Sequence, residues 1–342
     1  MHRRQFLAVS GIGALAAAVS PAAQPDLIKP HALKQGDTVG LITPSTPMMD
    51  PDRTVVVDRT MRYFDLKPKW AANVGRRANF ADAIEHRVAD LHAMFADPQV
   101  RGVFCVRGGY GAGQLLDRID YDLIRRNPKV FIGYSDITAL HLAIQKKAGL
   151  VTFHGPITTS RFTPYTQDCY RRALFSTAPL GALTNPPETN ALRPAHSLRA
   201  IRPGKARGRL IGGNLSLVCA TMGTPYEIDT QDRILFLEDV DEQTYNVDRM
   251  LTQLRLAGKL DQAAGIVWGE CSDCGVRDYK PSTSSPFGLS ETVDAIFKTV
   301  KTPVLSGLTI GHTDDQLTLP VGVMASLDAD RGTLTIEEAA CV

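Results

Sequence analysis

Residues 37–153 show two patterns of apolar residues in alternation, one typical of strands and one typical of helices. Short apolar runs of strand length follow one another, and between them apolar residues recur every three or four positions, the spacing of an amphipathic helix. Strand, helix, strand in this order is typical of a parallel sheet covered by helices. The pattern predicts strands at 37–42, 103–106, 130–134 and 150–153, and helices at 80–96 and 136–147.

The hydrophobic pattern changes after residue 164, where prolines are scattered through polar sequence with little periodicity. Such a stretch is typical of a linker, and we assign it to 166–207. Mixed strand and helix patterns return beyond it. The sequence therefore predicts an α/β protein, with an N-terminal parallel-sheet domain at 27–165 and a smaller mixed α/β C-terminal domain at 208–342. The C-terminal pattern predicts strands at 234–237, 266–268 and 304–310, helices at 247–254 and 293–300, and strand-like pieces from 317 to 336.

The first 23 residues have the three-part layout of an export signal. Arg3 and Arg4 precede an apolar run from Phe6 to Val19, and small residues follow at Ala22 and Ala23. The paired arginines indicate the twin-arginine route, and the run is shorter than the roughly 20 residues of a membrane span. We expect a cleaved signal at 1–23 and a periplasmic mature protein without a membrane span, or a cytoplasmic one if the leader does not function.

Charge balance and cysteine spacing exclude several functional and structural classes. The chain has 342 residues with 38 Lys and Arg against 36 Asp and Glu, so a chain without Arg3 and Arg4 is balanced and has no bulk electrostatic reason to bind nucleic acid. Six cysteines are too few and too irregular for a disulfide scaffold. Cys271 and Cys274 form a lone CxxC without a second ligand pair at zinc spacing, so no metal or cofactor is expected, and whether the two are bridged stays open.

The strongest local signal for chemistry is Phe131-Ile-Gly-Tyr-Ser135-Asp-Ile-Thr. An apolar strand runs through Gly133 into Ser135 and then directly into an amphipathic helix. A serine in such a turn presents its hydroxyl at the sheet edge beside helix-start amides. The pattern resembles a nucleophile elbow, although Ile137 stands where the second glycine of G-x-S-x-G would be. On spacing alone, Ser135 could equally cap the following helix.

A glycine-rich loop, Val106-Arg-Gly-Gly-Tyr-Gly-Ala-Gly113, follows the strand at 103–106. Such loops bring bare backbone N–H groups close to an anion. Neither a Walker-type Gly-Lys-Ser nor the acidic partner of a dinucleotide fingerprint is present. An oxyanion role beside a serine nucleophile therefore fits this loop better than phosphate binding.

A nucleophilic serine needs a base and usually a carboxylate that orients the base. His154 and His312 both follow apolar strands into turns, where catalytic groups of open sheets tend to lie, and residue type alone ranks them equally. Glu238 ends an apolar strand, where a buried charge needs a partner. A salt bridge with Arg249 would explain Glu238 as well as a catalytic role does.

Together these segments resemble the LD-carboxypeptidase family of serine peptidases, which includes muramoyltetrapeptide carboxypeptidases and microcin C immunity proteins. The matching stretches occur in the family's order over most of the chain. They are Arg107-Gly-Gly-Tyr-Gly111, Ile132-Gly-Tyr-Ser-Asp-Ile137, Gly212-Gly-Asn-Leu-Ser216, Leu235-Phe-Leu-Glu-Asp239 with Asp248-Arg-Met-Leu251, and Gly311-His312.

The resemblance implies a catalytic triad of Ser135, Glu238 and His312 in a site between the two domains. It also implies an oxyanion hole formed by the backbone N–H of Asp136 and one amide of the glycine-rich loop, where we favour Gly109 over Gly108. His154 then becomes a structural residue near the site. The family is typically homodimeric, so a homodimer is expected.

The implied reaction is removal of the terminal D-alanine from the L,D bond of murein stem tetrapeptides, without a cofactor. Arg107 is a candidate for binding the free carboxylate of the substrate, although it could instead pair with Asp120 or Asp122. Two alternatives remain: hydrolysis of a peptidyl or aminoacyl-nucleotide toxin, as in microcin immunity, and a non-catalytic muropeptide-binding protein. Export departs from the family pattern, because recycling enzymes of this family commonly work in the cytoplasm.

Overall fold

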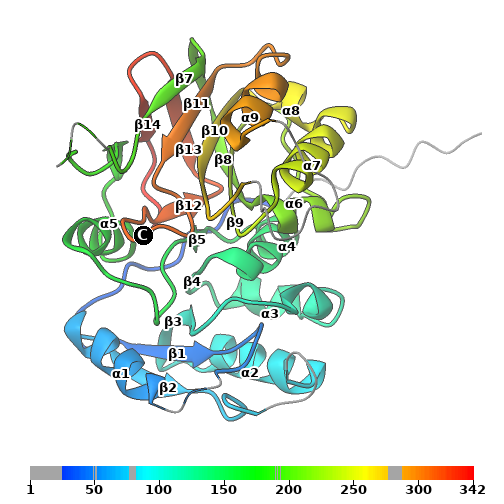
Figure 1. Ribbon diagram of the computed structural model, residues 1–342. Coiled ribbons are helices and arrows are strands. Elements are labelled where there is room, and N and C mark those ends of the chain that lie inside the picture. The colour runs from blue at the N-terminus through cyan, green and yellow to red at the C-terminus, as the bar shows by residue number, and fades with distance from the viewer. Residues whose placement is uncertain are drawn as a thin grey trace, which may run out of the picture.

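The computed structural model contains two β-sheets. The first sheet lies at the bottom of Figure 1 and the second at the top. The structure describes residues 25–48, 50, 52–76, 82–188, 190, 192, 194–275 and 287–342. The predicted export signal at 1–23 lies outside these residues. Among the helices of the described ranges, none has both the length and the apolar character needed to cross a bilayer.

The first sheet confirms the parallel sheet predicted from the N-terminal pattern. Its first five strands along the chain run parallel, and a strand from the C-terminal half completes the sheet in antiparallel pairing. The order across the sheet is β12 (Leu319–Val321), β5 (Thr152–His154), β4 (Val130–Gly133), β3 (Val100–Cys105), β1 (Thr38–Ile42) and β2 (Lys67–Trp70).

Helices cover both faces of this sheet, because the strands are apolar on both faces. Phe131 faces a core formed with α2, α3 and α4, whereas its neighbours Val130 and Ile132 face a second core formed with α1 and α5. The helices are α1 (Arg53–Tyr63), α2 (Ile84–Ala96), α3 (Tyr121–Arg126), α4 (Thr138–Ala148) and α5 (Pro164–Leu174), with short 3₁₀ turns η1 (Ala112–Leu115) and η2 (Ser135–Ile137).

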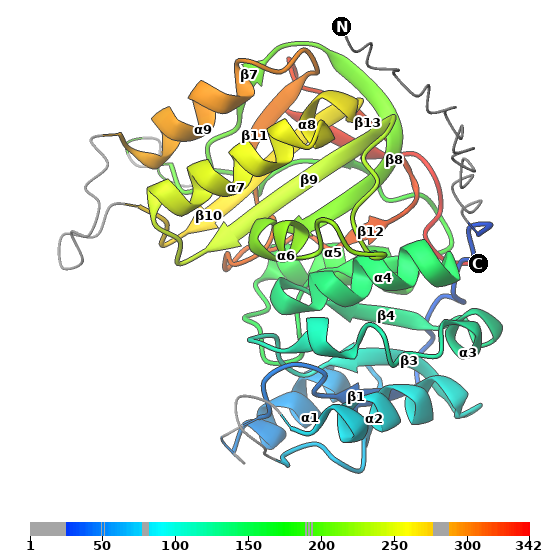
Figure 2. The same ribbon diagram turned by 90° about the vertical axis from the view of Figure 1, so that its right-hand side faces the viewer.

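The second sheet is mixed. Four central strands run parallel and antiparallel strands flank them on both sides. Figure 2 shows helices lying along one face of these central strands. The sheet order is β6 (Gly181–Leu183), β14 (Thr333–Ile336), β13 (Met324–Asp328), β8 (Lys205–Asn214), β9 (Arg233–Val240), β10 (Gly265–Ser272), β11 (Val304–Leu308) and β7 (Arg199–Arg202), and the helices are α6 (Leu215–Ala220), α7 (Thr244–Leu256), α8 (Lys259–Gln262) and α9 (Leu289–Phe297).

The segment predicted as a linker, 166–207, differs from that expectation. It contains most of α5, whose side chains Tyr170 and Leu174 are fully buried, and both β6 and β7, which form the two edges of the second sheet. The prolines lie between these elements. The reason is that β6 and β7 are short edge strands with one buried side chain each, Leu183 and Ile201, so neither contains an apolar run.

The two halves are also interwoven. Strand β12 belongs by sequence to the C-terminal half, yet it pairs with β5 in the first sheet, where Leu319 lies opposite His154. The last residue, Val342, donates a backbone hydrogen bond of 2.9 Å to the carbonyl of Pro30. The boundary of the N-terminal domain is therefore not a single point near residue 165.

Candidate active site

The carboxyl ends of the parallel strands of both sheets converge on one region. In the first sheet β4 ends before Ser135 and β5 ends at His154, while in the second sheet Glu238 lies near the end of β9 and His312 follows β11. The backbone N–H of Asn214, at the end of β8, donates a 2.9 Å bond to the hydroxyl of Thr138, at the start of α4. Ligand sites of open α/β sheets lie at such carboxyl edges.

Ser135 is the first residue of η2, in the strained turn that follows β4. Its φ angle is +64°, a left-handed conformation that is uncommon for a residue with a side chain and that clusters at functional sites. Ser135 does not act as the helix cap considered above, because its hydroxyl makes no hydrogen bond within the described residues. A strained strand-to-helix turn with an unengaged hydroxyl is the geometry of a nucleophile elbow.

The glycine-rich loop lies against this turn. A Cβ on Gly108 would come within 3.5 Å of the Ser135 hydroxyl oxygen, so the missing side chain leaves the space beside the nucleophile open. Gly109 has φ of +111° and faces Thr46 instead, whose Oγ1 a Cβ would meet at 2.3 Å. Neither position accepts a larger residue without displacing its neighbours.

The buried carboxylate of Asp136 fixes the loop to the elbow, a role that the sequence reasoning missed. Asp136 Oδ2 accepts hydrogen bonds from the hydroxyl of Ser45 (2.5 Å) and from the backbone N–H of Ala112 (2.7 Å). Arg87, also buried, donates to the carbonyls of Pro44 and Gly111, each at 2.8 Å. Burial raises the pKa of Asp136, and these hydrogen bonds oppose that effect.

Glu238 and His312 form a hydrogen-bonded pair in the second sheet. Nδ1 of His312 lies 2.9 Å from Oε2 of Glu238, and Glu238 is fully buried. Gly311 makes this approach possible, because a Cβ there would lie 2.0 Å from the same carboxylate oxygen. Burial raises the pKa of Glu238, while the hydrogen bond from His312 opposes the rise. Arg249, the alternative partner, instead lies over the ring of Tyr245.

The serine turn and the histidine loop are in contact. The rings of Tyr134, which precedes Ser135, and His312 have centroids 4.8 Å apart. Within the described residues no hydrogen bond joins Ser135 to His312, as is common where a catalytic hydrogen bond tightens only on substrate binding. The structure thus brings together the elements that carry Ser135, Glu238 and His312, with 18% of the His312 side chain left exposed.

Comparisons with known proteins identify the family of the chain. The LD-carboxypeptidase N-terminal domain family matches residues 39–155, and the LD-carboxypeptidase C-terminal domain family matches residues 207–327. A probable murein peptide carboxypeptidase of Bacillus subtilis is 39% identical over 315 residues, which cover 90% of this chain and 94% of the relative. The chain belongs to the LD-carboxypeptidase family. It is therefore a member of a hydrolase family, and the names of some relatives refer to murein peptides.

Two further relatives mark the range of this family. A murein tetrapeptide carboxypeptidase of Pseudomonas aeruginosa is 30% identical over 308 residues, covering 86% of this chain and 94% of the relative. The solved structure of the microcin C7 self immunity protein MccF in complex with aspartyl sulfamoyl adenosine superposes with a TM-score of 0.82 and 26% identity, covering 92% of this chain and all of that one. The fold of this LD-carboxypeptidase family member is thus shared by relatives with different named ligands.

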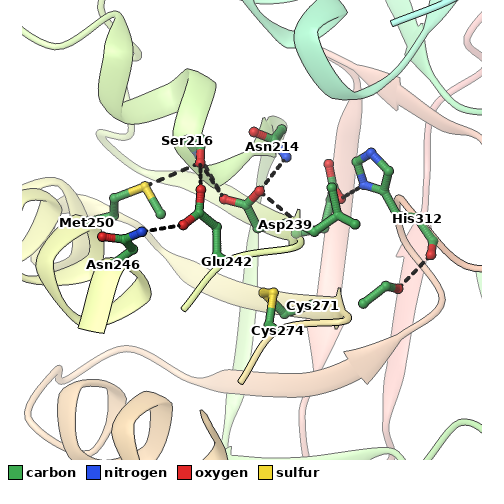
Figure 3. The surroundings of a disulfide bond; sticks show 12 residues. Asn214, Ser216, Asp239, Glu242, Asn246, Met250, Cys271, Cys274 and His312 are labelled. Atoms are coloured by element: carbon green, nitrogen blue, oxygen red, sulfur yellow. Dashed lines mark hydrogen bonds and ion pairs between the residues drawn. A yellow bond between two sulfur atoms is a disulfide. The ribbon is translucent and has the colours of Figure 1, made fainter. Parts of the chain in front are cut away.

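A polar network that the sequence reasoning also missed supports the second sheet's edge in this family member. Asp239 accepts hydrogen bonds from the side-chain amide of Asn214 (2.9 Å) and from the hydroxyl of Ser216 (2.8 Å), as Figure 3 shows. Because Asp239 follows Glu238 in β9, the network holds the end of that strand. The segment Gly212-Gly-Asn-Leu-Ser216, one of the stretches that carry the family resemblance, was the sequence signal for this network.

A disulfide joins Cys271, near the end of β10, to Cys274, two residues beyond the strand (Figure 3). Between the two cysteines, the Ser272 hydroxyl donates a 2.5 Å hydrogen bond to the backbone carbonyl of His312. The bridged turn therefore supports the histidine loop. In the described part of the LD-carboxypeptidase fold, no group of three or more His, Cys, Asp or Glu side chains is arranged to hold a metal ion.

Arg107 borders a small cavity beside the glycine-rich loop. The cavity measures about 160 Å³ and is lined by Met48, Asp50, Arg53, Arg107 and Thr159. Within the described residues Arg107 pairs with neither Asp120 nor Asp122; Asp120 instead caps α3 through the N–H of Leu123. Arg107 is half-buried and directly precedes Gly108, so its side chain lies one residue from the glycine that faces Ser135.

Proposed function

We propose that the protein is a serine carboxypeptidase that removes the terminal D-alanine from the L,D bond of murein stem tetrapeptides. The observation that carries the proposal is the hydrogen bond of 2.9 Å between His312 and the buried Glu238, beside a serine turn with a left-handed φ. Relatives named murein peptide and murein tetrapeptide carboxypeptidase support the substrate class.

In this mechanism His312 takes the proton of the Ser135 hydroxyl through Nε2, while Glu238 holds the ring by Nδ1 and stabilises the imidazolium. Ser135 attacks the carbonyl carbon of the terminal peptide bond. The backbone N–H groups of Asp136 and Gly109 stabilise the resulting oxyanion. His312 then protonates the leaving amine, D-alanine departs, and water hydrolyses the acyl-enzyme with His312 again as base.

A carboxypeptidase must recognise a free carboxylate. We assign this role to Arg107, because a guanidinium binds a carboxylate with two parallel hydrogen bonds and the cavity beside Arg107 opens next to the loop that faces Ser135. The substitution Arg107→Ala should raise KM for the tetrapeptide about tenfold or more with a smaller change in kcat. An unchanged KM would remove Arg107 from this role.

We also propose that the protein works in the periplasm as a homodimer. The leader at 1–23 supports export, and the family resemblance supports the dimer. Export would place the enzyme beside intact murein. Cell fractionation of the full chain and light scattering of the mature chain test these two statements separately.

A second candidate substrate is an aminoacyl or peptidyl nucleotide. The likeness to MccF bound to aspartyl sulfamoyl adenosine favours it, and the same triad would cleave such a bond. Export argues against it, because such toxins are processed inside the cell. A non-catalytic muropeptide-binding protein is the third possibility, and it would lack a reactive serine.

The deciding experiment follows product formation by mass spectrometry. The mature chain, its Ser135→Ala variant and the control Ser290→Ala, on the exposed start of α9, are incubated with disaccharide tetrapeptide and with an aminoacyl nucleotide. We expect the wild type and Ser290→Ala to release alanine from the tetrapeptide, and Ser135→Ala to lose at least 10³-fold in rate.

Fluorophosphonate labelling separates the alternatives. Labelling of Ser135 without alanine release would indicate a serine hydrolase with another substrate. Absence of both labelling and hydrolysis in the folded wild type would support the binding protein.

A further inference from the structure

His154 is a fully buried histidine for which the proposed reaction has no use. It is the last residue of β5, opposite Gly133 of β4, two residues before Ser135. Its exposed fraction is 0%, and neither ring nitrogen has a hydrogen-bond partner among the described residues. Buried polar atoms are rarely left unpaired, and exceptions in native structures often have a functional reason.

The unpaired atoms of His154 face an unpaired atom of the triad carboxylate. Oε2 of Glu238 is bonded to His312, whereas Oε1 of Glu238 is buried and has no partner among the described residues. Nε2 of His154 lies 3.8 Å from that Oε1, less than about 1 Å beyond a normal N–H···O hydrogen bond. The two unpaired groups therefore lie close to each other.

We propose that His154 is a positioning residue that donates a hydrogen bond from Nε2–H to Oε1 of Glu238 when the site closes on substrate. This inference rests on the proposed serine mechanism. With both oxygens bonded, the carboxylate is fixed in the plane that aims Oε2 at His312. A singly bonded carboxylate in the same cavity would leave one oxygen desolvated and free to rotate.

The surroundings of His154 keep its ring neutral. A neutral ring has one N–H, which is enough to donate a hydrogen bond to Glu238. Burial lowers the pKa of His154 well below its usual value, and the neighbouring His141 and His312 act in the same direction. The rings of Tyr134 and Phe236 enclose it, with centroids at 6.2 and 5.3 Å. Neutral His154 therefore adds a hydrogen bond to Glu238 without adding a charge that would compete with His312.

The sign of the pH effect follows from the negative charge that Glu238 presents to His312. The His154 donor offsets part of that charge, so its removal favours both the imidazolium form of His312 and protonation of Glu238. The Glu238–His312 pair then binds its first proton at a higher pH, so the acid limb of the activity profile moves to higher pH. The ionisable groups that face Glu238 or His154 are His312, His141, Asp239 and Tyr134.

The first test measures the rate of fluorophosphonate labelling of Ser135 against pH, which requires no knowledge of the natural substrate. His154→Phe fills the cavity without a donor, and His154→Gln restores an N–H donor. His92→Phe, a histidine on α2 away from the site, is the control. We expect His154→Phe to label tenfold or more slowly, with its acid limb at higher pH. His154→Gln should recover most of both, and His92→Phe should match the wild type.

Labelling of folded His154→Phe at the wild-type rate with an unmoved acid limb would overturn the positioning role. Equal losses in His154→Phe and His154→Gln without a shift of the acid limb would overturn it too, because packing alone would explain them. If the wild type itself does not label, the serine mechanism fails, and this outcome is distinct from the other two.

A second measurement needs no substitution. In the wild type, ¹⁵N NMR of the histidine rings should show His154 as the neutral Nε2–H tautomer across the active pH range. The Nδ1–H tautomer would overturn the proposal, because Nε2 would then have no proton to donate to Glu238.

Discussion

The two sheets supply different kinds of groups to the same site. In the proposed mechanism the first sheet supplies the nucleophile and the backbone amides, from a strained turn that Asp136 and the glycine-rich loop hold. The second sheet would supply the base and a buried carboxylate, and one hydrogen bond joins His312 to Glu238. Substitutions in the first sheet should therefore lower the rate by displacing Ser135. Substitutions in the second sheet should lower it by changing the charge at His312 and Glu238. Substitutions in the two sheets are expected to differ in their pH signatures.

The largest effect is expected in the second sheet. Glu238→Gln keeps the shape of the side chain but removes the charge that stabilises the imidazolium, and kcat should fall by roughly 10⁴-fold, as for the equivalent change in other triads. Steady-state kinetics on the tetrapeptide checks this, with Glu291→Gln on α9 as the control. A loss below about tenfold would mean that Glu238 does not orient the base.

Acid should unfold the protein through its buried neutral histidines. Burial lowers the pKa of His141 to about 4, from 6.5 in the unfolded chain. The unfolded state thus binds more protons between these pH values, and stability falls as pH drops from 6.5 to 4, by roughly 3 kcal/mol for this group. Glu238, whose pKa is raised, acts in the opposite direction.

Urea unfolding midpoints measured from pH 7.5 to 4 check this expectation. His141→Gln keeps an amide in place of the ring, so its stability should vary less with pH than that of the wild type. A wild-type stability that does not change over this range would contradict the buried neutral state of His141.

In the first sheet, Asp136→Asn should lower the labelling rate of Ser135 about tenfold. The amide keeps one acceptor for the hydroxyl of Ser45 or the N–H of Ala112 but loses the charge that holds both. The acid limb should not move, because Asp136 contacts neither His312 nor Glu238 by a hydrogen bond in the described structure. A shift of the acid limb in Asp136→Asn would contradict the expectation that only substitutions in the second sheet change the pH dependence.

The smallest effect is expected from the disulfide. The Cys271→Ser, Cys274→Ser double variant loses a bridge that closes a loop of four residues, worth at most about 2 kcal/mol of stability. Its rate should fall only a few-fold, since the Ser272 bond to the His312 carbonyl remains available. Thermal unfolding and kcat, each measured with and without a thiol reductant in the wild type, check both numbers. A rate loss above a hundredfold would make the bridged turn part of the base's support.

Local patterns predicted the elements that end at the site. The apolar run at 130–133 followed by helical spacing located the Ser135 turn, and the strand at 234–237 located Glu238, because these signals depend on near neighbours in sequence. The family resemblance, rather than residue type, separated His312 from His154. The structure shows why residue type could not: both histidines lie beside the same carboxylate.

Other features depend on contacts between distant residues and left little local signal. The pairing of β12 with β5, and the approach of Asp136 to Ser45, join residues 91 or more positions apart. Helix α5 was different, because a signal was present. Thr163 caps the helix, Pro164 occupies its first turn, and buried residues recur at Cys169, Tyr170 and Ala173, but the surrounding prolines concealed the pattern.

The position of β12 has a consequence for biosynthesis. A nascent chain that has emerged as far as residue 207 carries the complete Ser135 turn, but the outer edge of β5 has no partner until residues 319–321 have been synthesised. His312 and Glu238 also arrive late. We therefore expect no hydrolase activity from a chain that is still being synthesised before residue 312. The first sheet is completed soon after that point, when β12 is synthesised.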